Sequence, residues 1–168
     1  LKILLTNDDG IHASGLWAAA KALSQVGEVC VVVPDREQSG IGAALTLHHP
    51  VYARSVPTGA YLNEVGEHPN PISAPIVDGT PGDSCILGLE QLIGKVDLVV
   101  SGINTGSNLG WDVLVAGTVG AALQGYVRGY PTIAISVGSV LNPQFDVAAD
   151  FLQLTASQLD KASTPDLF

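Results

Sequence analysis

The chain is poor in charged, aromatic and sulfur-containing residues. Of its 168 residues 14% are charged and 5% aromatic, two are Cys and none is Met. Cys30 and Cys85 stand in apolar surroundings without a CxxC partner, which excludes a disulfide scaffold and predicts core thiols in a reducing compartment. No apolar run approaches the ~18 residues of a membrane span, and the acidic turn at residues 7–9 interrupts any signal-peptide pattern. We therefore expect a cytoplasmic protein without a membrane partner.

Basic residues are also scarce. Seven Lys and Arg stand against sixteen Asp and Glu, which gives a formal net charge of -9. A protein that binds nucleic acid polymers needs a basic face, so this class is not expected. Long-range steering would not help an anionic small substrate either, and any phosphate must be held locally by a metal, by backbone N–H groups or by a single basic side chain.

Glycine and apolar residues, by contrast, are abundant. Nineteen glycines and 46% hydrophobic residues favour one α/β domain over residues 1–168 with tight loops. Residues 50–60 include a short extended segment, and residues 61–75 form a hairpin or an excursion, with a return to the core at Ile76. The alternating pattern predicts a mainly parallel sheet with right-handed crossovers, with strands over 3–6, 28–33, 96–101 and 132–137 and helices over 16–25, 79–93, 117–129 and 144–161.

The first strand runs into an acidic turn. It should end near Thr6, followed by Asn7, Asp8, Asp9 and Gly10, at the strand end where open α/β sheets bind ligands. Two adjacent carboxylates raise each other's pKa or require a cation, and hard oxygen ligands suit Mg²⁺ or a similar ion. The alternative is that both acids only start a turn and cap the next helix; this stretch alone does not decide.

Two further polar residues follow other strands of the predicted sheet. Ser39 lies in the loop 34–46 and Asn104 lies three residues beyond the strand 96–101. Two carboxylates, one hydroxyl and one amide oxygen form a set suited to one divalent cation, Mg²⁺ or Mn²⁺, with places left for water. We therefore predict a metal site made of Asp8, Asp9, Ser39 and Asn104.

Other polar groups near this edge are open to two interpretations. The helix start at Ala116, Gly117 and Thr118 points free N–H groups toward the crevice and can bind phosphate. Arg36 could meet a phosphate, but an ordinary surface ion pair is favoured. Thr80 either caps the helix that carries an acid in its first turn or touches a ligand, and capping is the default.

The segments ILLTNDDGIHASG, PDREQSG, GTPGDS, and VSGINTGSNLGWDV followed by AGTVGAA lie in this order between residues 3 and 122. Together they resemble the SurE survival proteins, which are metal-dependent 5'/3'-nucleotidases. The resemblance implies a Rossmann-like three-layer α/β fold and a homodimer or homotetramer. It also makes Asp8, Asp9, Ser39 and Asn104 the metal-binding positions, in agreement with the set predicted above.

The sequence departs from the family pattern at three places. Ala116 stands where Ser is common, so one side-chain donor to phosphate is lost. Ser14 stands where Pro is common. Known members also continue beyond the position of Phe168 into another core strand and a C-terminal oligomerisation region, so we expect the chain to be a fragment.

These observations predict hydrolysis of nucleoside 5'- and 3'-monophosphates by a metal-activated water. Asp8 or Asp9 accepts the proton of the water, and Asn104 acts with the phosphate-binding residues Ala116, Gly117 and Thr118 to hold the transferring group. One alternative is a metal and nucleotide binder without turnover. The other is a receiver-like phospho-acceptor domain, which would need a Lys near the last strand, where residues 132–139 have none.

Overall fold

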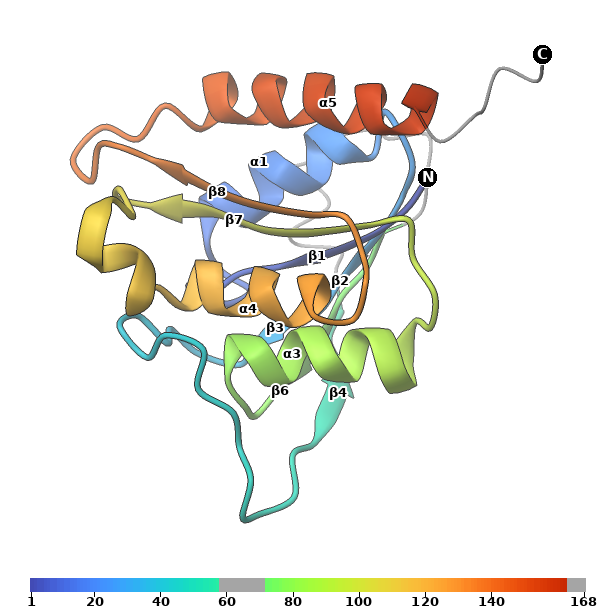
Figure 1. The fold of residues 1–168 in the computed structure, drawn as a ribbon, viewed down its shortest axis with the longest axis vertical. Coiled ribbons are helices and arrows are strands. Elements are labelled where there is room, and N and C mark those ends of the chain that lie inside the picture. Colours follow the sequence, from blue (N-terminus) through green and yellow to red (C-terminus); the bar gives the residue numbers. More distant parts are fainter. Residues whose placement is uncertain (58–71, 163–168) are drawn as a thin grey trace.

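A computed structural model describes residues 1–57 and 72–162. Its main sheet has five strands in the order β5-β2-β1-β7-β8, and every neighbouring pair is parallel. Strands β1 and β7 are neighbours in this sheet (Figure 1). The acidic turn follows β1, and Asn104 belongs to β7. The five strands are β1 (Lys2–Thr6), β2 (Glu28–Val31), β5 (Ile72–Ser73), β7 (Leu98–Thr105) and β8 (Thr132–Val137).

A second, smaller sheet has the order β3-β6-β4, with β3 (Val33–Pro34) parallel to β6 (Pro75–Val77) and β4 (Ala53–Ser55) antiparallel to it. The single strand predicted over 28–33 is therefore divided: β2 pairs with β1 and β5, whereas β3 pairs with β6. Ile76 is buried in β6, which confirms the predicted return to the core, and the chain already joins the main sheet at Ile72 in β5. Residues 61–71 of the predicted hairpin lie outside the described residues.

Helices cover both faces of the main sheet, so the predicted three-layer α/β architecture is confirmed. In Figure 1, α1 (Ser14–Leu23) and α5 (Phe145–Ala162) lie together on one face, and α3 (Pro81–Leu87) and α4 (Gly117–Tyr126) lie on the other. The π-helical turn η1 (Gly88–Leu92) continues α3, and the 3₁₀ turn η2 (Gly110–Leu114) precedes α4. Among the described residues, no helix is long and apolar enough to cross a membrane.

The core follows the two-residue period of the strands. Ile3 and Leu5 of β1 belong to the large apolar cluster beneath α1 and α5. Leu4 faces the opposite side and packs in a smaller cluster with Cys85 and Leu89. Burial raises the pKa of Cys85 to about 12, and both cysteines are buried thiols, which confirms that they are core thiols.

The position of Asn104 differs from the prediction. Strand β7 does not end at Ser101 but continues to Thr105, with a shift of register against β8 between Ser101 and Asn104. Gly102 permits this irregularity because its φ is +129° and a Cβ there would lie 2.3 Å from the carbonyl oxygen of Ile135. Asn104 is therefore held in the last pairs of a strand, opposite Ser136, and is not part of a free loop.

Candidate functional site

The turn after β1 is closed by Asn7, not by the two aspartates. Its Oδ1 accepts a hydrogen bond from the Gly10 N–H (3.1 Å), and its Nδ2 donates to the Gly10 carbonyl (3.0 Å). The residue that caps α1 is Ala13, which makes no side-chain capping hydrogen bond. The alternative that Asp8 and Asp9 cap the next helix is therefore wrong, and their carboxylates are left for another purpose.

Asp8 is packed against the start of α4. Its side chain is buried, and the Thr118 hydroxyl donates a 2.6 Å hydrogen bond to Oδ1. A Cβ at Gly117 would lie 2.7 Å from the Asp8 Cβ, so only glycine allows this approach. Burial raises the pKa of Asp8, and the hydrogen bonds from Thr118 offset only part of this effect. Thr118 thus holds the carboxylate in place.

Asp9 is the more strongly perturbed acid. Burial, the neighbouring charge of Asp8 and the charge of Glu37 raise its pKa to about 6, against a lowering contribution from the Thr105 backbone. Its Oδ2 is buried and has no hydrogen-bond partner among the described residues. Among the described residues, no basic side chain lowers the pKa of Asp8 or Asp9. The pair is therefore an uncompensated patch of negative charge, an arrangement that a bound cation would relieve.

A cavity of about 230 Å³ opens beside Asp8 at the carboxyl ends of β1 and β7. It brings together Asp8, Ser39, Asn104 and Ala116 of the predicted site. The other predicted residues do not line it: Asp9 is adjacent to Asp8 in sequence, and Gly117 and Thr118 contact Asp8. The remaining lining residues are Gly40, Thr105, Gly106, Ser107, Asn108, Asp112 and Val115.

The two neutral side chains of the predicted metal set differ in how firmly they are held. The Asn104 Nδ2 donates to the carbonyl oxygens of Gly106 (2.9 Å) and Thr105 (3.4 Å), which fixes the side chain and leaves Oδ1 as the atom available to a ligand. Ser39 is exposed, and its hydroxyl donates to Glu37 Oε1 (2.9 Å).

Sequence reasoning missed three side chains near the cavity. Glu37 adds negative charge beside both aspartates. Asn108 and Asp112 line the cavity. The only feature of the sequence that could have indicated them is their position in the unusual glycine-containing stretch after β7. No group of three His, Cys, Asp or Glu residues that could hold a metal occurs in the described ranges. The predicted set consists of carboxylate, hydroxyl and amide oxygens, the type of ligand that hard cations prefer.

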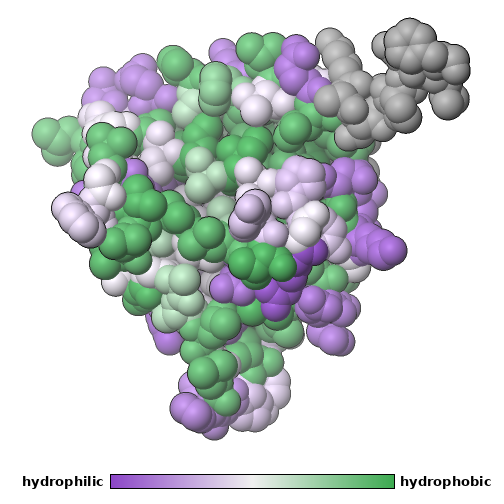
Figure 2. All heavy atoms as spheres, in the orientation of Figure 1, coloured by the Kyte–Doolittle hydropathy of each residue, from purple (hydrophilic) through white to green (hydrophobic). Residues whose placement is uncertain are grey.

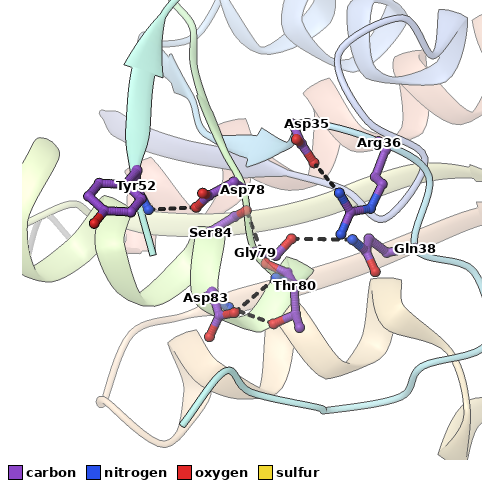
Figure 3. Close-up of polar contacts among 9 residues, drawn as sticks. All are labelled: Asp35, Arg36, Gln38, Tyr52, Asp78, Gly79, Thr80, Asp83 and Ser84. Atoms are coloured by element: carbon purple, nitrogen blue, oxygen red, sulfur yellow. Dashed lines mark hydrogen bonds and ion pairs between the residues drawn. The ribbon is translucent and has the colours of Figure 1, made fainter. Parts of the chain in front are cut away.

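The start of α3 lies beside Gln38, which precedes Ser39 in the loop (Figure 3). Thr80 and Asp83 form a reciprocal capping box, so the prediction that Thr80 caps the helix is confirmed. Arg36 is exposed and pairs with Asp35 at 3.6 Å, as predicted for a surface ion pair. Its guanidinium is not part of the cavity lining.

Comparison with known proteins identifies the family. The family model for survival protein SurE matches residues 3–166. The chain belongs to the SurE family. It is 54% identical over 140 residues to a 5'-nucleotidase SurE of Dehalococcoides mccartyi, which covers 82% of this chain and 49% of the relative. It is 47% identical to the 5'-nucleotidase SurE of Geotalea daltonii, over 100% of this chain and 63% of that protein.

A solved structure supports the same assignment. The crystal structure of the SurE protein from Aquifex aeolicus superposes with a TM-score of 0.80 at 36% sequence identity, covering 96% of this chain and 61% of that one. The chain thus spans about half to less than two thirds of the length of these SurE proteins. The resemblance that the motifs indicated is confirmed.

Proposed function

We propose that this chain carries the active site of a metal-dependent phosphomonoesterase that hydrolyses nucleoside 5'- and 3'-monophosphates to nucleoside and phosphate. The observation that carries the proposal is the pair of adjacent carboxylates, Asp8 and Asp9, which have raised pKa values and no basic partner among the described residues, and of which Asp8 lines a cavity. The relatives named 5'-nucleotidase SurE support the same reaction.

The proposed metal ligands are Asp8, Asp9, Ser39 and Asn104, which together would hold one Mg²⁺ or Mn²⁺ ion. The fit rests on the unpartnered Oδ2 of Asp9 and on the two negative charges, which match one divalent cation. Such an ion supplies charge neutralisation at the phosphate and lowers the pKa of the attacking water.

The catalytic roles proposed for this chain fall to Asp8, Asp9 and Asn104. Asp8 or Asp9 accepts the proton of the attacking water, through a carboxylate oxygen that does not hold the ion. Asn104, whose amide is fixed by two carbonyl groups, orients the phosphate. Further phosphate contacts are assigned to Ala116, Gly117 and Thr118 at the start of α4, where backbone N–H groups and the helix dipole favour an anion.

Phosphate release from a panel of nucleoside 5'- and 3'-monophosphates tests the proposal. The wild-type chain, Asp9→Asn and the exposed control Asp150→Asn are assayed with Mn²⁺, with Mg²⁺ and with chelator. We expect metal-dependent release by the wild type and the control, and a loss of 10²-fold or more in Asp9→Asn. Near-normal release by Asp9→Asn with Mn²⁺ would contradict the role of Asp9. Metal binding without release would favour a non-catalytic nucleotide binder.

The family resemblance also leads us to propose a homodimer or homotetramer and a cytoplasmic location. The two buried cysteine thiols agree with a reducing compartment. Light scattering after size-exclusion chromatography tests the assembly: a monomeric mass at micromolar concentration contradicts it for this chain.

A further inference from the structure

The loop that carries Ser39 is fastened to three other parts of the molecule. At its start, the Gln38 N–H donates to the Asp8 carbonyl (2.7 Å). In its middle, the Gly42 N–H donates to the Val115 carbonyl (2.8 Å) just before α4. Residues 38–46 contain no helix or strand, so the position of Ser39 at the cavity depends on such contacts.

The third attachment is made by the first turn of α3. Both Asp83 carboxylate oxygens accept from the Thr46 N–H, at 3.1 and 3.3 Å, and the Thr80 hydroxyl donates to the Ala44 carbonyl at 2.7 Å. The same two side chains cap the helix: Asp83 accepts from the Thr80 N–H at 2.9 Å, and Thr80 accepts from the Asp83 N–H at 3.0 Å (Figure 3). Capping alone requires only the second set of contacts.

Close packing leaves the loop little room to shift. A Cβ on Gly82 of α3 would lie 2.7 Å from Leu45 Cδ2, and a Cβ on Gly120 of α4 would lie 2.3 Å from the Gly42 carbonyl oxygen. Burial alone would raise the pKa of Asp83, but the hydrogen bonds from Thr46 and Thr80 outweigh it and hold the pKa below its ordinary value. Asp83 is therefore a charged acceptor at neutral pH, and its bonds to the loop are charge-assisted.

We propose that Thr80 and Asp83 are positioning residues that hold the loop 38–46 so that Ser39 and Gly40 line the cavity. This inference rests on the proposed function, because it assigns Ser39 to the metal. Thr80 and Asp83 act through the loop and touch neither metal nor substrate. A change at the start of α3 is thus transmitted to the cavity through Ala44 and Thr46.

The test compares Thr80→Val with Thr80→Ser. Valine keeps the shape but loses both the capping acceptor and the donor to Ala44, whereas serine keeps both. The exposed Gln158→Gly variant in α5 is the control for a loss of helix stability away from the site. Mn²⁺ affinity is measured by calorimetry on the metal-free 168-residue chains, together with the thermal unfolding midpoint and phosphate release.

We expect Thr80→Val to bind Mn²⁺ about 10-fold more weakly, Thr80→Ser to stay within 2-fold of the wild type, and Gln158→Gly to lower the midpoint without changing Mn²⁺ affinity. Unchanged Mn²⁺ affinity in Thr80→Val would overturn the inference. If Thr80→Val does not fold, Asp83→Asn, which keeps the Thr80 to Ala44 contact, is judged by the same criterion. If the wild-type chain binds Mn²⁺ but releases no phosphate, this result would contradict the proposed function and would not contradict the role of Thr80 and Asp83.

Discussion

At the scale of single residues, the two aspartates after β1 have different surroundings. Asp8 is buried and held by the Thr118 hydroxyl, whereas Asp9 is less buried and has one oxygen without a partner among the described residues. Burial raises the pKa of both carboxylates, and the negative charge of each disfavours ionisation of the other. A chain without metal therefore bears a cost for keeping these carboxylates ionised, and this cost is measurable.

Replacing Asp9 by Asn is expected to stabilise the metal-free chain at pH 7. The folded-state pKa of about 6 lies above the ordinary value of 3.8, so the folded chain binds the proton more tightly and loses stability as pH rises from 3.8 through 6. Asp9 is partly exposed, so solvent screens its charge and reduces the energetic effect of the raised pKa. We expect Asp9→Asn to increase the free energy of unfolding by roughly 1 kcal/mol at pH 7. Urea unfolding with chelator at pH 4 and pH 7 measures it. An equal difference at both pH values would contradict the assignment.

Replacing Thr118 by Val should weaken the site without unfolding the chain. The variant keeps the shape of Thr118 but removes the 2.6 Å hydrogen bond to Asp8. Loss of a group that orients a ligand typically costs 10–100-fold in metal affinity or activity, and we expect kcat/KM for AMP to fall by about that much. Thr118→Ser, which keeps the hydroxyl, should remain within a few-fold of wild type. Wild-type kcat/KM in Thr118→Val would contradict the role of this hydroxyl.

At the scale of elements, the start of α4 lies directly against the carboxyl end of β1. Gly117→Ala would place a Cβ 2.7 Å from the Asp8 Cβ, so helix and turn must separate. We expect a loss of 1–3 kcal/mol in the free energy of unfolding and a loss of Mn²⁺ binding. Gly138→Ala is the matched control, because nothing lies within 4 Å of its Cβ. Denaturant titration and calorimetry check both, and wild-type Mn²⁺ affinity in Gly117→Ala would contradict the contact.

The elements that the sequence predicts well are those with a clear apolar period. The structure confirms, to within two residues, the predicted strands at 3–6 and 132–137 and the C-terminal helix. Each of these elements has an apolar pattern that can be recognised in the local sequence. The predicted end of the strand at Ser101 was wrong because β7 pairs with β8 again after Gly102. This pairing is a tertiary effect with no local signal in the sequence. The division between β2 and β3 likewise depends on which strand each half meets.

The candidate site was predictable in its residue types but not in its contacts. Adjacent acids after a buried strand indicated a cation, and the order of the motifs indicated the family. That Thr118 donates to Asp8, that Glu37 adds charge beside both acids and that Asp83 binds the Ser39 loop depend on residues far apart in sequence. Periodicity and spacing carry no information about such contacts.

At the scale of the whole molecule, the core and the site occupy separate parts of the fold. The face shown in Figure 2 carries both apolar and polar side chains. The largest buried cluster lies between the sheet and the layer of α1 and α5. The cavity opens at the carboxyl ends of β1 and β7, next to the start of α4. Stability and chemistry should therefore be separable by mutation.

Leu152→Ala tests this separation. Leu152 is fully buried in α5, so truncation should cost 2–5 kcal/mol of unfolding free energy while kcat/KM for AMP below the unfolding transition changes less than 2-fold. Leu141→Ala, at a position 98% exposed, should change neither quantity. Thermal unfolding and initial rates at 20 °C measure both. A 10-fold loss of kcat/KM in folded Leu152→Ala would show that the α5 layer acts on the site.

The central claim is that one divalent cation binds between Asp8, Asp9, Ser39 and Asn104. Its most direct test is the anomalous difference map of crystals of this chain grown with Mn²⁺. The account predicts one strong peak per chain at the cavity beside Asp8, about 2–2.5 Å from carboxylate oxygens of Asp8 and Asp9. A map without a peak there, from chain saturated with Mn²⁺ in the same buffer, would contradict the account.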